Sequence, residues 1–158
     1  MLIALFLVHL LLPVRAAPPK LPIILIPDML GSVLEAHVNR TMKDTPHFYC
    51  RTHADWSFIW LQLHKMALYD CLNSELALHT HINATNRYEN ATGVRVRPYD
   101  FGLLGGVQSV DPLLPLITHN FDSIIDAFIA KGYTPGKNIL GAPYDFRLAP
   151  DGLLEVLH

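Results

Sequence analysis

Hydrophobic residues form a continuous run, without alternation, early in the chain. Residues 23–26 read IILI between Pro22 and Pro27. A short apolar run bounded by prolines predicts a strand that is buried on both faces, as in a parallel sheet. Valine and arginine alternate over residues 94–97, which predicts a half-exposed strand. The proline that follows indicates a position near a sheet edge, because proline cannot donate to a neighbouring strand.

The clearest helical pattern lies at residues 121–131. Apolar side chains recur there at the spacing of one helix face, at Phe121, Ile124, Ile125, Phe128 and Ile129. Asn120 is expected to cap this helix and Gly132 to end it. Residues 138–140 predict a second short strand. A strand, a crossover helix and another strand together indicate an α/β sheet.

The stretches between these elements show no clear period. Residues 37–60 are expected to form mixed loop, and the glycine-containing residues 102–112 to form another. The second loop lacks the Lys-Ser/Thr ending of a phosphate-binding loop, so it is assigned no nucleotide role. Residues 56–72 are the most aromatic and apolar irregular patch. Two interpretations of this patch stay open: it belongs to the core, or it is a lid or membrane-facing loop.

The first residues indicate the compartment. Residues 2–14 are an apolar run that is too short to span about 30 Å of hydrocarbon as a helix. Followed by small residues, they predict a secretory signal peptide over residues 1–16, although no Lys or Arg precedes the run. A buried N-terminal helix is the alternative. Three N-x-S/T triplets agree with a secreted or lysosomal route and are candidate glycosylation sites, at Asn39, Asn83 and Asn90.

Composition narrows the class of protein. The 158 residues are 51% hydrophobic and 16% charged, which suits one domain with a hydrophobic core. The formal net charge is −2 and lysine and arginine form no cluster, so no nucleic-acid partner is expected. No cofactor is expected either.

The two cysteines allow two interpretations. In an oxidising compartment, Cys50 and Cys71 are expected to form one disulfide that closes a loop of about 20 residues and stabilises the chain by roughly 3 kcal/mol. The alternative is a zinc site formed by His47, Cys50, His53 and Cys71. Zinc would require reduced thiols, so no metal is assigned.

Local chemistry offers no complete catalytic apparatus. No serine lies in G-x-S-x-G, the strained turn that presents the nucleophile of α/β-hydrolases. The chain has nine histidines, but no spacing ties one of them to a nucleophile.

Four segments, in chain order, resemble the family of lecithin:cholesterol acyltransferase and lysosomal phospholipase A. They are PIILIP with LG and LEA at 22–36, YC with IWL and DC at 49–71, VRVR with DP at 94–112, and GYTPG with GAPYDFRLAP at 132–150. The resemblance implies an α/β fold, namely the N-terminal part of an α/β-hydrolase fold with a disulfide-closed lid, truncated before the nucleophile elbow. Residues 17–158 would form this incomplete domain, with the lid at about 48–72.

The resemblance also implies a function. The full-length enzyme would be a lipid O-acyltransferase or phospholipase A, which moves an acyl chain from a phospholipid to a lipid alcohol or water through an acyl-serine. A Ser–Asp–His triad carries this reaction and would lie beyond residue 158, so the chain itself is expected to be inactive. The implied partner is a phospholipid, lipoprotein or membrane surface. The alternative is a non-enzymatic secreted lipid-surface-binding or decoy protein.

One part of the active site falls inside the chain by this resemblance. The backbone N–H of Met29 aligns with a donor of the oxyanion hole, which stabilises the charge of the tetrahedral intermediate. Asp28 stands where the family has glycine, and it would be strained there if the position needs a positive φ.

Two further groups of residues are assigned roles. Asp145 and Arg147 are expected to pair and to hold the 141–150 loop in shape. The lid candidates for lipid contact are Trp56, Phe58, Trp60 and Leu61.

Overall fold

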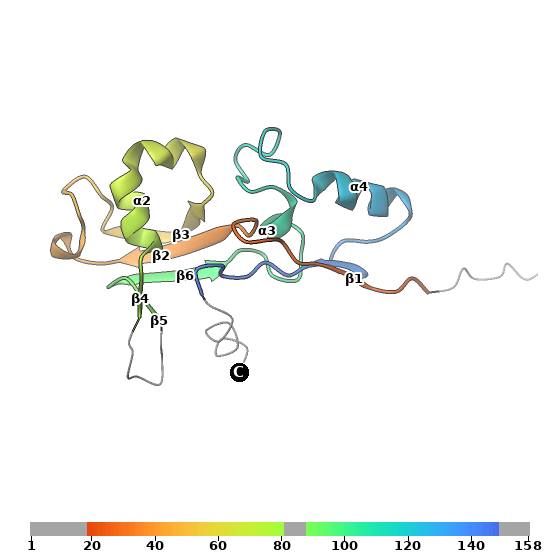
Figure 1. Cartoon of the computed structure of the whole chain (residues 1–158), viewed down its shortest axis with the longest axis horizontal. Coiled ribbons are helices and arrows are strands. Elements are labelled where there is room, and N and C mark those ends of the chain that lie inside the picture. Colours follow the sequence, from red (N-terminus) through yellow and green to blue (C-terminus); the bar gives the residue numbers. More distant parts are fainter. Residues whose placement is uncertain (1–18, 81–87, 149–158) are drawn as a thin grey trace, which may run out of the picture.

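The computed structural model describes residues 19–80 and 88–148. Helices and strands are mixed along these ranges, and one disulfide is present (Figure 1). The predicted signal peptide, Asn83 and the apolar residues after 148 lie outside the described residues. Among the described helices, none is long and apolar enough to cross a membrane.

A parallel pair of strands forms one part of the molecule. β1 (Ile23–Leu25) runs beside β7 (Ile139–Gly141), with Ile23 opposite Ile139. α3 (Gly105–Gln108) and α4 (Asp122–Ala130) lie between them in the sequence. Buried side chains from these elements form one hydrophobic cluster: Leu25, Leu104, Val107, Ile125 and Ile139. The predicted strand–crossover–strand unit of an α/β sheet is therefore confirmed.

The prediction that β1 is buried on both faces was wrong. Leu25 faces the cluster, but Ile24 is 58% exposed and Ile26 is 64% exposed. In the described ranges only one face of the parallel pair is covered, because the cluster that packs on it comes from a single side. The apolar run therefore alternates in burial, although it does not alternate in hydropathy.

A three-stranded antiparallel sheet forms the second part. Its order is β3 (His53–Trp60), β2 (Leu34–Asn39) and β6 (Val94–Pro98). The alternating strand predicted at 94–97 is confirmed, and it lies at an edge of this sheet as expected. The mixed loop predicted for residues 37–60 was wrong, because part of β2 and all of β3 fall within it. The missed signal is the alternation of Leu34, Ala36 and Val38, which all point into the core.

The remaining elements surround this sheet. α2 (Tyr69–Leu76) contributes Leu72 to the cluster formed with β2, β3 and β6. Two 3-10 helices, η1 (Met42–Asp44) and η2 (Leu63–Leu68), lie before β3 and before α2. β4 (Leu78–Thr80) pairs antiparallel with β5 (Tyr88–Asn90).

Val33 joins the two parts. This fully buried residue donates its N–H to the Gly106 carbonyl at 3.0 Å, and its own carbonyl accepts from the Tyr99 N–H at 3.0 Å. Gly106 is required at this junction, because a Cβ there would lie 2.0 Å from the Tyr99 carbonyl oxygen. The loop expected at 102–112 thus contains the short helix α3, held against the sheet by close backbone approach.

The main helix keeps its predicted end but not its predicted cap. Gly132 has φ +79°, and the N–H groups of Gly132 and Tyr133 return to the carbonyls of Ile129 and Phe128, which ends α4 as expected. The Asn120 cap was wrong, since Phe121 is the N-cap residue and makes no side-chain capping bond.

Candidate functional site

The loop after β1 makes a tight turn that presents Met29. The Gly31 N–H bonds the Asp28 carbonyl at 3.1 Å. The positive φ of this turn, 76°, falls on Leu30 and not on Asp28. The backbone strain that was expected at Asp28 therefore falls on Leu30, two residues later. Leu30 occupies the turn position where a glycine is usually favoured. The side chain of Met29 is 69% exposed.

Two side chains from distant parts of the sequence hold the carbonyl groups of this turn. The Trp60 indole Nε1 donates to the Leu30 carbonyl at 2.9 Å. The Asn120 amide Nδ2 donates to the Gly31 carbonyl and to the Val107 carbonyl, each at 3.0 Å. The loop is thus tied to β3 on one side and to the start of α4 on the other.

The Met29 N–H remains available in this arrangement. Within residues 19–80 and 88–148, no group accepts a hydrogen bond from it. An unpaired backbone donor in a turn whose carbonyls are fixed elsewhere is what an oxyanion donor requires, because preorganisation avoids the cost of reorienting the dipole during the reaction. No local pattern in the sequence assigned Trp60 or Asn120 to this turn.

The segment after β7 packs against the same loop. The Tyr144 N–H donates to the Oγ of Ser32 at 3.0 Å, and Ser32 is fully buried. Ser32 is therefore a structural contact between the two loops that follow the parallel strands.

Arg147 connects this segment with two other elements. Its guanidinium donates two bonds to the carboxylate of Asp145, at 2.8 Å and 2.6 Å. It also donates to the Leu76 carbonyl at 3.1 Å and to Oδ1 of Asn90 at 2.8 Å. The predicted pairing of Asp145 with Arg147 is confirmed. The bonds from Arg147 to the end of α2 and to the end of β5 were not predicted.

An open apolar cavity of about 730 Å³ lies beside these residues. Ile26 and Pro27, immediately before the Met29 turn, form part of its wall, and Phe101, Tyr144 and Leu148 form another part. The cavity is large enough for part of a lipid chain.

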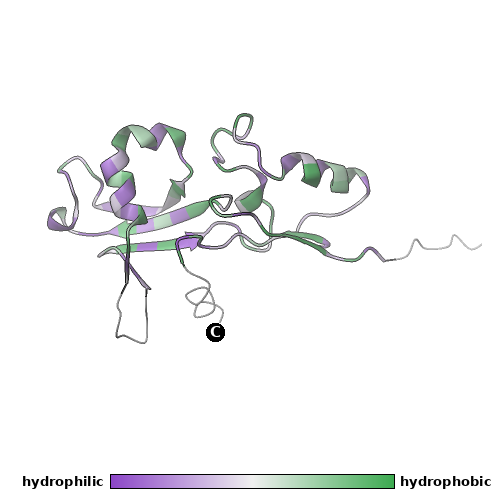
Figure 2. Ribbon diagram, viewed as in Figure 1, coloured by the Kyte–Doolittle hydropathy of each residue, from purple (hydrophilic) through white to green (hydrophobic). Residues whose placement is uncertain are grey.

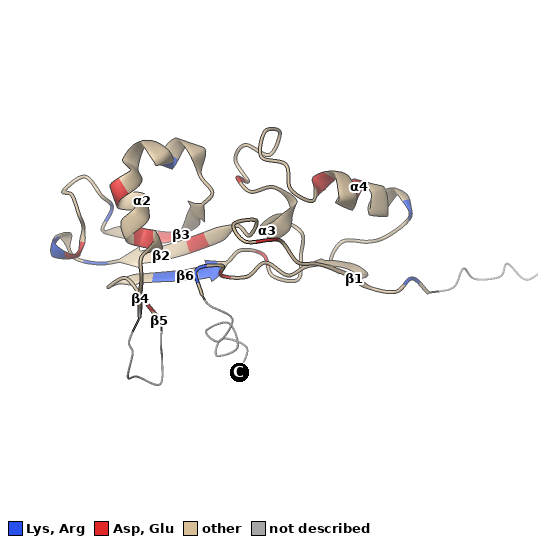
Figure 3. Ribbon diagram, in the orientation of Figure 1, with Lys and Arg blue, Asp and Glu red and all other residues tan. Residues whose placement is uncertain are grey.

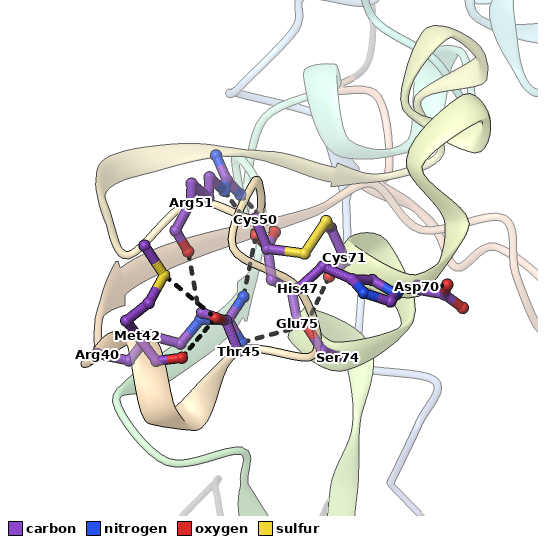
Figure 4. The surroundings of a disulfide bond; sticks show 10 residues. All are labelled: Arg40, Met42, Thr45, His47, Cys50, Arg51, Asp70, Cys71, Ser74 and Glu75. Atoms are coloured by element: carbon purple, nitrogen blue, oxygen red, sulfur yellow. Dashed lines mark hydrogen bonds and ion pairs between the residues drawn. A yellow bond between two sulfur atoms is a disulfide. The ribbon is translucent and has the colours of Figure 1, made fainter.

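The disulfide between Cys50 and Cys71 is confirmed, with a Cα–Cα distance of 5.3 Å across 21 positions (Figure 4). Both sulfur atoms are used in this bond, so the alternative zinc site has no thiolates. Beside the disulfide, a bidentate ion pair joins Arg51 to Glu75 at 2.7 and 2.6 Å, and Arg40 approaches Glu75 at 3.8 Å. These ion pairs link the start of the predicted lid to α2.

Burial shifts the pKa of two bases near this cluster. Desolvation lowers the pKa of Arg40 from its ordinary value, and attraction to Glu75 opposes this only partly. Desolvation, followed by repulsion from Arg51, lowers the pKa of Lys65, whose ammonium donates to the Phe58 carbonyl at 2.6 Å. Both groups serve the structure of the region rather than presenting charge to a ligand.

The four candidates for lipid contact lie within β3 and directly after it, and all are half-buried: Trp56, Phe58, Trp60 and Leu61. Trp56 lies under Arg97, at 3.9 Å from ring centroid to guanidinium carbon. Phe58 packs edge-on against Tyr99, and Trp60 packs edge-on against Phe146. The Leu61 N–H donates to the Val110 carbonyl at 3.0 Å. Each candidate thus has a contact within the chain.

Two of the candidate glycosylation sites lie in the described ranges. Asn39 ends β2 with an exposed side chain. Asn90 ends β5 with a half-buried side chain, and its Oδ1 accepts from Arg147. The amide nitrogen of Asn90, the atom that would carry an N-glycan, takes no part in that bond.

Histidine–carboxylate pairs occur, but they do not form a catalytic triad. His47 Nε2 lies 2.9 Å from Asp70, and His119 Nδ1 contacts Asp122. In the described ranges no serine hydroxyl bonds a histidine. Within residues 19–80 and 88–148, these pairs therefore do not complete a serine–histidine–carboxylate arrangement.

Comparison with known proteins identifies the family. The family model described as lecithin:cholesterol acyltransferase matches residues 56–156. The chain is 32% identical to the Mus musculus protein named lysosomal phospholipase A and acyltransferase over 162 residues, which cover 96% of this chain and 37% of that protein. It is 30% identical to the Rattus norvegicus protein of the same name over 154 residues, covering 95% and 36%.

A second group of relatives carries a different name. The Mus musculus protein named phosphatidylcholine-sterol acyltransferase is 30% identical over 133 residues, which cover 82% of this chain and 29% of that protein. The chain therefore spans about a third of the length of the curated relatives that it matches. On the family match and these identities, the chain belongs to the lecithin:cholesterol acyltransferase family.

Proposed function

We propose that the chain supplies the N-terminal part of a lipid O-acyltransferase or phospholipase A with an α/β-hydrolase fold. In the complete enzyme, an acyl group passes from a phospholipid to a serine and then to a lipid alcohol or water. Family membership supports this reaction class, and the parallel β1–β7 pair supports the fold.

The observation that carries the proposal is the Met29 turn. Its N–H has no acceptor among the described residues, and Trp60 and Asn120 hold the neighbouring carbonyls. Met29 would donate to the oxyanion of the tetrahedral intermediate, and the apolar cavity that begins at Ile26 would take an acyl chain. Since the 158 residues contain no G-x-S-x-G, we propose that they do not turn over lipid on their own.

A chimaera tests this role directly. The N-terminal third of the rat lysosomal phospholipase A and acyltransferase is replaced by the matching residues of this chain, and hydrolysis of a fluorogenic phospholipid is measured. We expect an active chimaera. Met29→Pro removes the N–H and should lower the rate by about 100- to 1,000-fold, whereas Met29→Ala keeps the N–H and should retain the rate. Two outcomes contradict the proposal: a Met29→Pro chimaera that stays active, and a chimaera with Met29 unchanged that folds with its disulfide but is inactive.

The secretory route is proposed together with this function. We propose a signal peptide over residues 1–16 and a secreted or lysosomal destination. We also propose N-glycans on Asn39, Asn83 and Asn90. The N-x-S/T triplets and the disulfide support this route. Glycosidase treatment of the secreted chain, compared with single Asn→Gln variants, should remove one mobility step for each occupied site.

A non-enzymatic lipid-surface or decoy protein is the second candidate, because an open apolar cavity can hold part of a lipid without any catalytic group. The same chimaera separates the two functions. A chimaera that folds and binds phospholipid vesicles but has no activity supports the decoy.

A further inference from the structure

The triplet Asn90-Ala91-Thr92 lies in the turn that joins β5 to β6. Asn90 is the last residue of β5, and β6 begins at Val94, whose N–H bonds the Ala91 carbonyl at 2.9 Å. Gly93 supplies the positive φ of this turn, 68°, and the Thr92 side chain is exposed. Because N-glycans are carried on surface turns and loops, the triplet is placed where the folded chain can carry one.

The Asn90 side chain is held at its carbonyl oxygen. Its Oδ1 accepts a hydrogen bond from Nη2 of Arg147 at 2.8 Å, and the Arg147 side chain is only 8% exposed. In N-glycosylation, the amide nitrogen Nδ2 loses one proton and bonds the anomeric carbon of N-acetylglucosamine, while the lipid diphosphate that carried the sugar leaves. Oδ1 remains a hydrogen-bond acceptor in this product. A glycan on Asn90 would therefore start from an amide that Arg147 keeps in one orientation.

A polar hollow of about 500 Å³ begins at Asn90 and extends over β2 and β6. Its volume falls within the roughly 300–1,000 Å³ that small-ligand sites occupy. The side chains of its wall that can form hydrogen bonds come from β2, β5, β6 and the turn: His37, Asn39, Glu89, Asn90, Thr92 and Arg95. Figure 2 shows hydrophilic residues along β6, and Figure 3 shows basic residues on the same strand. The wall can therefore donate to and accept from the hydroxyl groups of a sugar.

Two side chains of this wall are held by an aromatic ring. The His37 ring lies 5.9 Å from the Trp56 ring between centroids, and the Arg95 guanidinium carbon lies 5.8 Å from the Trp56 ring centroid. Within residues 19–80 and 88–148, neither side chain makes a hydrogen bond or an ion pair. Contact with the ring restricts where the two side chains lie without using their N–H groups. His37 and Arg95 are therefore positioned donors at the wall of the hollow.

The triplet that begins at Asn39 opens on the same hollow but is placed differently. Asn39 ends β2 with an exposed side chain. The Thr41 hydroxyl of its triplet donates to the Asp44 carboxylate at 2.7 Å. Asn90, in contrast, is half-buried and is fixed by Arg147. A sugar on Asn90 therefore begins inside the wall of the hollow, whereas a sugar on Asn39 begins at its outer rim.

The triplet, rather than exposure alone, identifies what the hollow would hold. A glycan on Asn90 is attached covalently at the wall, so its effective concentration in the hollow is on the order of millimolar, as for a short flexible linker. Contacts that are too weak to hold a free sugar can therefore hold the attached one. A sugar in the hollow would also touch β2, β5 and β6, and would thereby join the β4–β5 pair to the three-stranded sheet.

We propose that the first sugars of an N-glycan on Asn90 lie in this polar hollow, and that Arg147 orients the amide that carries them. This inference rests on the proposed secretory route, because only a chain that enters that route meets the glycosylation enzyme. It assigns a carbohydrate ligand to a surface that the proposed acyl transfer does not use. It also gives Arg95 and His37 a role as donors to sugar hydroxyl groups.

Removal of the glycan from the folded chain tests the proposal. The 158-residue chain is secreted with high-mannose glycans, and an endoglycosidase that cuts after the first N-acetylglucosamine is added. Release at each site is followed by mass spectrometry of the peptides. A hollow that is occupied about nine-tenths of the time leaves about one-tenth of the glycan open to the enzyme, so release from Asn90 should be about tenfold slower than from the reduced, unfolded chain.

A variant of the wall separates the hollow from the bulk of the folded chain. Arg95→Ala removes a donor and should speed the release from Asn90 by about threefold to tenfold, which is the effect of one net hydrogen bond. The matched control is Lys43→Ala, which removes an exposed basic side chain outside the hollow and should leave the rate unchanged.

Thermal melting gives an independent measurement. Thr92→Ala removes the triplet and hence the glycan, but it leaves Asn90 and Arg147 in place. It should lower the melting temperature by about 2–4 °C, as expected for the loss of one net hydrogen bond in a chain of this size. Thr92→Ser keeps the triplet and should melt with the parent chain. Produced in a bacterial periplasm without glycans, the two variants should melt together, which separates the glycan from the change of side chain.

Failure of this inference differs from failure of the proposed function. A chain that carries a glycan on Asn39 or Asn83 but not on Asn90 overturns the inference and leaves the secretory route standing. So does an Asn90 glycan that is released as fast as from the unfolded chain, or whose slow release Arg95→Ala does not change. A chain without a glycan at any triplet overturns the route and the inference together, whereas the chimaera still tests the acyl transfer.

Discussion

Replacing Arg147 with lysine should destabilise the fold strongly, although the charge is kept. The Arg147 and Asp145 side chains are only 8% and 10% exposed. Four bonds of the guanidinium reach Asp145, the Leu76 carbonyl and Asn90. A lysine ammonium is a point charge that cannot form the bidentate pair and reach both other acceptors.

The magnitude follows from the groups left without a partner. Breaking a buried ion pair costs about 3–5 kcal/mol, and each buried acceptor without a partner costs about 1–3 kcal/mol. Since lysine retains part of the attraction to Asp145, we expect Arg147→Lys to lower the free energy of unfolding by about 2–3 kcal/mol. Arg147→Met should cost more, because it leaves the Asp145 carboxylate buried without a counter-charge.

Urea unfolding of the secreted, disulfide-bonded chain measures this change from the shift in midpoint. Arg95→Lys is the matched control, because Arg95 is an exposed residue of β6, and it should change the stability by less than about 0.5 kcal/mol. If Arg147→Lys unfolds at the same urea concentration as the Arg95 control, the buried network does not stabilise the fold and the reasoning fails.

Three other changes address separate features. Glu75→Gln should lower the free energy of unfolding by about 3 kcal/mol in urea, because it leaves the buried Arg40 and its neighbour Arg51 without a counter-charge; a loss under about 1 kcal/mol would contradict this. Leu30→Gly should raise the melting temperature, since it relieves about 1 kcal/mol at a φ of 76°, whereas Leu30→Ala should give no comparable gain. The Asp44 carboxylate accepts a hydrogen bond from the Thr41 hydroxyl, which lowers the pKa of Asp44 in the folded chain. This carboxylate therefore adds to the free energy of unfolding at a pH above its ordinary pKa. That addition is lost as the pH falls through the lowered pKa of the folded chain. Between about pH 5 and pH 2, the free energy of unfolding should therefore fall less in Asp44→Asn than in the parent chain. If both chains lose the same stability over this range, the Asp44–Thr41 hydrogen bond does not contribute to acid unfolding.

Local patterns in the sequence predicted those elements whose cause is local. The spacing of Phe121 to Ile129 and the glycine after it produced α4 and its left-handed end, because both depend on neighbours within one or two turns. Alternation predicted β6, and two cysteines in an oxidising context predicted the disulfide. The family resemblance, read from short motifs, was confirmed by the comparisons.

The partners of long-range contacts could not be read from the sequence. Asn120 precedes a helix, so a local rule made it a cap, but its amide instead holds Gly31, 89 positions away. Burial of the apolar run at 23–26 likewise depends on what packs on each face, and the described chain covers only one.

The sequence by itself determined the class of this protein: the strands β1, β6 and β7, the helix α4, the disulfide and the family. Only the tertiary structure decided that the positive φ falls on Leu30, that Trp60 and Asn120 fix the Met29 turn, and that Arg147 holds the amide of Asn90. The physical reason is the range of the interactions. Periodicity, caps and turns are set by residues a few positions apart, whereas the pairing of a buried polar group depends on segments that meet only when the chain has folded.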